Sequence, residues 1–200
     1  MGRHVALLGL LALGIPSVPG LLPAAHANAL GRGDRTPSGA FQWLVARSAP
    51  PSWPRVVTPS TAATLSYPPS FGPVSGDPGS VSAAVRSPTG VYVAYLNATP
   101  QQGAERPRGF AAFRVHLLGE DHDEAVHEEA SAERVAFQGG RGSCVIDTYV
   151  TRVRHRRYRE IACLVAGTHA GTVVVAAALT SRWNQFRPWL QQSIAAFTVS

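Results

Sequence analysis

The clearest pattern of apolar and polar residues lies near the C-terminus, in the block that holds both cysteines and the densest run of arginines. If the chain reverses direction at residues 152–155, residues equally far from that turn face each other in an antiparallel hairpin. Cys144 then faces Cys163, and Tyr149 faces Tyr158. Directly opposed residues lie about 4.5–5.5 Å apart, close to the Cα distance of a disulfide. We therefore expect a hairpin joined by a Cys144–Cys163 disulfide.

A third strand is expected directly after this hairpin. Residues 173–178 are apolar without alternation, which is typical of a strand buried on both faces. Such a strand requires a layer above and a layer below the sheet. An apolar stripe within residues 188–197 predicts a helix that begins at Pro188, because proline is favoured at the first helical position. This helix would supply one of the two layers.

The middle of the chain shows shorter signals of the same kinds. Alternating residues predict strands at 64–67, 81–85 and 91–96, and the last two should form a hairpin. An apolar stripe with helical spacing predicts a helix over 110–118. The acidic segment at 120–133 is interpreted as a second helix.

The N-terminal residues differ in composition from this domain. A short positive segment, eleven apolar residues and small residues at positions 25 and 27 predict a cleaved signal peptide over 1–27. An uncleaved anchor is the alternative, although eleven apolar residues are too few to cross a hydrocarbon core of about 30 Å. After cleavage we expect no transmembrane segment. Residues 28–60 are rich in Pro, Gly and Ala and are interpreted as a lead-in or tether.

These elements predict a single α+β domain over residues 61–200. Its centre should be an antiparallel sheet of about five to seven strands, covered by helices on both faces and containing one disulfide-stapled hairpin. A secreted, extracytoplasmic location fits this disulfide, because cysteines pair in oxidising compartments.

Arginine supplies every basic side chain, and the formal net charge is +6. Guanidinium groups match carboxylates and phosphates, but a GC-rich coding sequence also produces arginine without lysine. Five arginines at or beside the hairpin turn are candidate anion-binding residues: Arg152, Arg154, Arg156, Arg157 and Arg159. They either form a clamp for an anionic polymer or keep an exposed turn solvated. Because we expect export, nucleic acid is not an expected partner.

Known catalytic and metal-binding motifs are missing from the sequence. The HDEAVH segment at 122–127 is not HExxH, and its two histidines would lie on different faces of a helix. Ser143 follows a glycine but lacks the second glycine of a nucleophile elbow. We therefore assign no catalytic residue, no metal site and no cofactor, and we expect a protein that is not an enzyme.

One pair of carboxylates is unusual. In the expected hairpin Asp147 faces Glu160, and opposed like charges are unfavourable. Arginines such as Arg159 could neutralise the pair, the register could differ by a residue, or the two groups could share a proton or a cation. These three explanations remain open at this point.

Several short segments resemble a group of exported actinobacterial proteins of unknown function. The segments are LSYP at 65–68, YLNATP at 95–100, GSCVID at 142–147, YREIAC at 158–163 and the closing stretch at 183–197. Domains of this group are similar to the PsbP-like fold, an α/β/α sandwich. The resemblance implies binding and assembly rather than catalysis. Relatives of the fold are often lipoproteins, but this chain lacks the cysteine that would carry the lipid.

The leading functional expectation is therefore an exported, non-enzymatic, envelope-associated binding or assembly domain. Its partner would be an anionic cell-envelope polymer or an envelope protein. The alternatives are a secreted hydrolase whose site is assembled only in space, and a purely structural secreted protein.

Overall fold

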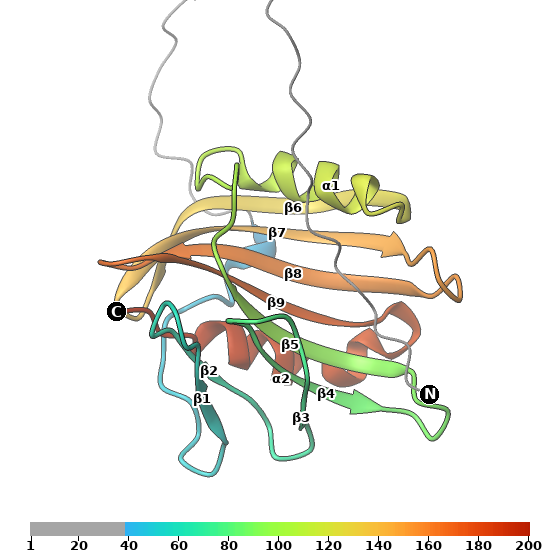
Figure 1. Cartoon of the computed structure of the whole chain (residues 1–200), viewed down its shortest axis with the longest axis horizontal. Coiled ribbons are helices and arrows are strands. Elements are labelled where there is room, and N and C mark those ends of the chain that lie inside the picture. The colour runs from blue at the N-terminus through green and yellow to red at the C-terminus, as the bar shows by residue number, and fades with distance from the viewer. Residues whose placement is uncertain (1–38) are drawn as a thin grey trace, which may run out of the picture. The chain divides into compact units, whose positions relative to one another are not determined.

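The structure, a computed structural model, describes residues 39–200 and contains a seven-stranded antiparallel sheet with the strand order β3-β4-β5-β9-β8-β7-β6 (Figure 1). A separate two-stranded sheet consists of β1 and β2. The strands are β1 (Arg55–Val57), β2 (Thr64–Ser66), β3 (Gly72–Val74), β4 (Val81–Arg86), β5 (Tyr92–Pro100), β6 (Glu124–Phe137), β7 (Gly140–Val150), β8 (Arg157–Ala166) and β9 (Gly171–Leu179). The helices are α1 (Phe110–Glu120) and α2 (Trp183–Ala195), with short 3-10 turns at Gly39–Phe41 and Thr180–Arg182.

The β7–β8 hairpin has the register expected from the sequence. Cys144 faces Cys163 and Tyr149 faces Tyr158, and a disulfide joins the two cysteines. The chain turns between Val150 and Arg157. The mostly antiparallel sheet and its disulfide-stapled hairpin are therefore confirmed.

β9 lies in the middle of the strand order and is buried on both faces, as its unbroken apolar sequence predicted. Val174, Ala176 and Ala178 enter one apolar cluster, together with residues of α2. The alternate residues Val173, Val175 and Ala177 enter a second cluster, together with Phe110 and Leu118 of α1. This division follows from the two-residue period of a strand. α1 is short and lies mainly against β6 and β7, so its cover of this side of the sheet is partial.

The helix predicted over residues 120–133 is wrong, because this segment forms most of β6, an edge strand. The pairing of β6 with β7 shifts register three times. Ala125 and Arg134 have left-handed backbones, with φ of 48° and 61°. Such irregularities break the two-residue alternation by which a strand is recognised. Because many of its acidic side chains face solvent, the segment resembled the outer face of a helix.

The C-terminal helix begins at Trp183, five residues before the predicted start, and Pro188 lies inside it. Proline removes one backbone hydrogen bond from a helix interior. Trp183, Phe186, Leu190 and Ile194 are nevertheless all buried against the sheet. Burial of large apolar side chains contributes about 1.5–3 kcal/mol each, which outweighs one missing hydrogen bond.

Part of the predicted lead-in belongs to the folded domain. Phe41 and Leu44 are buried in the same cluster as α2, and β1 pairs with β2. This part of the lead-in therefore packs on the domain. The expected signal peptide at 1–27 lies outside the described residues. Among residues 39–200, no helix has the length and apolar character needed to cross a membrane.

Candidate functional site

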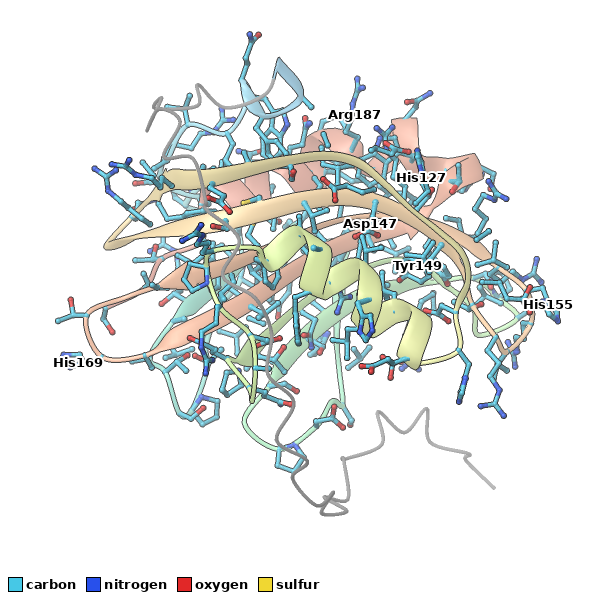
Figure 2. The ribbon with its side chains drawn as sticks, turned by 90° about the horizontal axis from the view of Figure 1, so that it is seen from above. His127, Asp147, Tyr149, His155, His169 and Arg187 are labelled. Carbon is cyan, nitrogen blue, oxygen red and sulfur yellow. A yellow bond between two sulfur atoms is a disulfide. The ribbon has the colours of Figure 1, made fainter. Side chains whose placement is uncertain are left out.

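A buried carboxylate cluster lies between α1 and the sheet. Asp147 on β7 faces Glu160 on β8, and both side chains have an exposed fraction of 0%. Arg114 of α1 reaches down to Glu160 with two nitrogens: Nε lies 2.7 Å from Oε1, and Nη2 lies 3.2 Å from Oε2. This two-pronged ion pair neutralises one of the two carboxylates. Figure 2 labels Asp147 on the strands beside α1.

Asp147 has no comparable partner. Neither of its carboxyl oxygens accepts a hydrogen bond from any residue in the described part of the chain. Burial, and after it the negative charge of Glu160, raises the pKa of Asp147 to about 9, against the opposing effect of Arg114. At neutral pH Asp147 is therefore protonated, and the cluster carries one negative and one positive charge.

This arrangement decides between the explanations for the opposed carboxylates. The register is as expected, so a slipped hairpin is excluded. An arginine does neutralise one member, but it is Arg114 of α1 rather than the neighbouring Arg159. The raised pKa of Asp147 supports a second contribution: Asp147 keeps its proton in the folded protein, so it carries no negative charge beside Glu160.

Tyrosines close the cluster on one side. The hydroxyl oxygens of Tyr95 and Tyr149 lie 2.8 Å apart, and the rings of Tyr149 and Tyr158 stack with centroids 5.9 Å apart. Burial raises the pKa of both Tyr95 and Tyr149 well above the usual value, so neither hydroxyl ionises. The two carboxylates of the cluster are thus buried beside the second apolar core, while Arg114 above them keeps 16% of its side chain exposed.

Four of the five candidate anion-binding arginines lie together at the exposed end of the β7–β8 hairpin, beyond the tyrosines. We call them the arginine tip: Arg152, Arg154, Arg156 and Arg157, all exposed. The six-residue turn is closed by a hydrogen bond from the amide of Thr151 to the carbonyl of Arg156. His155, labelled in Figure 2 at one end of the molecule, marks this tip.

Two acidic side chains lie beside the tip without covering it. Asp123 accepts a hydrogen bond from the backbone amide of Arg152 at 3.2 Å. Glu124 lies 3.8 Å from the ring of His155. Neither contact involves a guanidinium group of the tip.

Arg159 does not belong to the tip. It pairs with Glu129 of β6, and its guanidinium carbon lies 5.0 Å from the centre of the Trp183 ring. This is a cation–π contact that ties α2 to the sheet. The structure therefore places Arg159 in a packing role.

The part of the chain that the structure describes also bears on metal binding. No group of three His, Cys, Asp or Glu side chains within residues 39–200 is arranged to hold a metal ion. His127 lies on β6, so the helical spacing considered for residues 122–127 does not arise.

Comparisons with known proteins identify the fold. No protein-family model matches the chain, and no curated protein is similar to it in sequence. The chain is similar to the solution structure of cyanobacterial PsbP (CyanoP) from Synechocystis sp. PCC 6803, with a TM-score of 0.53 and 11% identity over 76% of this chain and 95% of that one. At this identity the similarity establishes a PsbP-like fold and nothing about activity.

Two further structures are more distant. One is LpqN of Mycobacterium tuberculosis, described as involved in cell envelope biogenesis, with a TM-score of 0.43 and 13% identity over 74% of this chain and 90% of that one. The other is PA94 of Pseudomonas aeruginosa, described as a protein of unknown function and putative regulator, with a TM-score of 0.40 and 8% identity over 72% of this chain and 94% of that one. Neither similarity is strong enough to carry an argument.

Proposed function

We propose that this PsbP-like domain is an exported, non-catalytic binding module whose arginine tip engages an anionic polymer of the cell envelope. The observation that carries the proposal is the exposure of all four arginines of the tip, three within one six-residue turn and Arg157 directly after it at the start of β8. Each guanidinium offers a planar fork of donors that matches carboxylate or phosphate. A repeating polymer can engage several of them at once.

Accessibility favours binding over hydrolysis. The carboxyl group whose pKa lies in a range useful for acid–base catalysis is Asp147, and its exposed fraction is 0%. A general acid or base must come within hydrogen-bond reach of the substrate. In this fold the tyrosines and α1 cover Asp147, so a substrate would not come within that distance of its carboxyl group.

Export is supported by two observations from different parts of the chain. Cys144 and Cys163 form a disulfide, a bond that persists in oxidising compartments. The N-terminal sequence carries the charge and hydropathy pattern of a signal peptide. An extracytoplasmic location would bring the arginine tip near acidic envelope material.

The test is capture of the purified, oxidised protein on beads carrying polyglutamate or polyphosphate, at low and at high salt. The tip variant replaces three residues with glutamine: Arg152, Arg154 and Arg156. The matched control replaces three exposed arginines elsewhere with glutamine: Arg55, Arg182 and Arg187. Both variants lose three positive charges. A difference in capture between them therefore shows that the position of the arginines matters, and not only their number.

We expect the wild-type protein and the control to be captured at low salt and released at high salt, because exposed charges are screened within about 10 Å at 0.1 M salt. The tip variant should bind at least about tenfold more weakly, since each charge-assisted hydrogen bond contributes about 1.5–3 kcal/mol. Equal capture of the tip variant and the control would remove the arginine tip from the proposal.

A further inference from the structure

The arginine tip lies at an end of the sheet that carries a further exposed arginine. The turn between β4 and β5 projects from the same end as the turn between β7 and β8 (Figure 1). Arg86, the last residue of β4, is exposed there. Since it belongs to a separate hairpin, spacing along the chain does not connect it with the tip.

The strand register fixes how far Arg86 lies from the tip. Ala94 of β5 and Arg159 of β8 face the same residue of β9 from its two sides. Because β5 and β8 both run antiparallel to β9, Tyr92 and Arg157, each two residues earlier, lie in one row across the sheet. Arg86 pairs with Tyr92 in that row. The order β4-β5-β9-β8 places three strand spacings, roughly 14 Å in all, between Arg86 and Arg157.

Tyr92 holds the side chain of Arg86 in place. Nη2 of Arg86 donates a hydrogen bond to the Tyr92 hydroxyl at 2.8 Å, and the guanidinium carbon lies 4.9 Å from the centre of the ring. The tyrosine ring carries no charge, so these contacts position the positive charge of Arg86 without neutralising it. A guanidinium has five N–H donors, and most of them remain for an external anion.

A second tyrosine connects this position to the tip. The Tyr158 hydroxyl donates a hydrogen bond to the backbone carbonyl of Tyr92 at 2.6 Å. Burial raises the pKa of Tyr158, and the positive charges of Arg156 and Arg154 oppose that rise. The guanidinium groups of these two tip arginines are therefore within electrostatic reach of the hydroxyl that is bonded to Tyr92. The positive surface thus continues from the tip towards β5 and β4.

Acidic residues flank the tip on its other side, beside β6. Four of them lie between the last turn of α1 and the start of β6: Glu120, Asp121, Asp123 and Glu124. Towards β4 the pattern is different, because the β4–β5 turn at residues 87–91 and the residues 179–181 at the end of β9 include no Asp or Glu. The charges at this end of the sheet therefore favour an anion that extends from the tip towards β4.

From this arrangement we infer that the anion-binding surface extends from the arginine tip to Arg86, and that its ligand is a linear polymer of acidic groups lying across the ends of β8, β9, β5 and β4. The inference rests on the proposed function and adds a direction and a minimum length to it. An extended peptide covers about 3.3–3.6 Å per residue. About four residues of polyglutamate therefore span the distance between Arg157 and Arg86, and a shorter ligand cannot reach both.

Backbone amide NMR shifts of the full, oxidised protein at low ionic strength provide the test. Acetylated diglutamate, about 7 Å long, is the short probe. Dodecaglutamate is the long carboxylate probe and linear polyphosphate the long phosphate probe, and the one that binds more tightly identifies the preferred acidic group. With that long probe we expect shifts over residues 151–157 and also over 86–92. With diglutamate the shifts should centre on residues 151–157 alone.

Two variants and a control isolate the contribution of Arg86. Arg86→Gln should weaken binding of the long probe about threefold, as expected for an exposed ion pair, and leave diglutamate binding unchanged. Tyr92→Phe removes only the hydroxyl that holds Arg86, so the long probe should bind more weakly although the net charge is the same. Arg55→Gln removes one charge at an exposed position on β1 and should change neither affinity measurably.

Two results would overturn the extended surface. One is equal affinity of Arg86→Gln and Arg55→Gln for the long probe. The other is a loss in Arg86→Gln that is the same for the short and the long probe. Failure of the proposed function would look different, because the variant of the arginine tip would then be captured as well as its own control, whatever the effect of Arg86→Gln.

Discussion

Replacing Asp147 with asparagine should remove a large part of the pH dependence of stability, because this residue holds a proton in the folded protein that it releases on unfolding. Burial and the charge of Glu160 raise the pKa of Asp147 to about 9 in the folded state, whereas an aspartate in an unfolded chain has a pKa of about 3.9. Between these two values the folded state binds one proton more than the unfolded state. Stability from this group is therefore complete below about pH 4 and falls as the pH rises towards 9.

The change of the unfolding free energy with pH follows from the difference in bound protons between the folded and the unfolded state. One extra proton in the folded state lowers the free energy of unfolding by about 1.4 kcal/mol for each pH unit. From pH 5 to pH 8 the loss is about 4 kcal/mol, a large fraction of the 5–15 kcal/mol that stabilises an ordinary domain. Asparagine does not ionise, so the Asp147→Asn protein should escape this loss.

Urea denaturation at pH 5, 6, 7 and 8, followed by tryptophan fluorescence with the disulfide intact, measures the effect. The quantity to compare is the difference in unfolding free energy between Asp147→Asn and wild type, since other titrating groups contribute equally to both. This difference should grow in favour of the variant by about 4 kcal/mol across the series. Asp77→Asn, the same change at an exposed carboxylate, should give a constant difference. A constant difference for Asp147→Asn as well would mean that Asp147 is ionised in the folded protein.

Four further changes have expected outcomes that chemical or thermal denaturation can check. Arg114→Met leaves a buried carboxylate without its counter-charge and should destabilise the fold by about 3–5 kcal/mol; a loss below about 1 kcal/mol would argue that water reaches the cluster. The Cys144→Ala/Cys163→Ala double variant should lose about 3 kcal/mol, and unchanged stability would contradict a constraining disulfide. Gly140→Ala places a Cβ 2.2 Å from a backbone oxygen and should cost about 1–3 kcal/mol. Gly119→Ala, which meets no atom within 4 Å in α1, should instead stabilise the helix by up to about 1 kcal/mol.

Local pairing explains why so much of the β7–β8 hairpin was predictable. Its turn is short, which limits the possible registers of the two strands. The disulfide also requires Cys144 to face Cys163, and one register meets both conditions. The same logic failed for β6, because its three register shifts leave no regular alternation to detect. The start of α2 was misplaced for a different reason: burial of Trp183 and Phe186 against the sheet offsets the penalty of Pro188, and the sequence alone does not indicate that balance.

The candidate sites were predictable only where they lie within one segment. The arginine tip is a single turn, so its residues could be named in advance. The partner of Glu160 could not, because Arg114 is 46 residues away along the chain and lies next to an apolar stripe that predicts burial but not ion pairing.

The two outer strands of the sheet restrict how this protein can associate with others. β6 interrupts its ladder at three places, and β3 at the opposite edge has three residues, one of which is Pro73, without a backbone N–H (Figure 1). A foreign strand that extends a sheet needs a long, regular row of free backbone donors and acceptors. Neither border of this sheet offers one, so sheet-to-sheet polymerisation and capture of extended peptides are both disfavoured. The binding proposed for this domain therefore relies on side chains rather than on strand addition, and single side-chain substitutions on its surface should change its specificity.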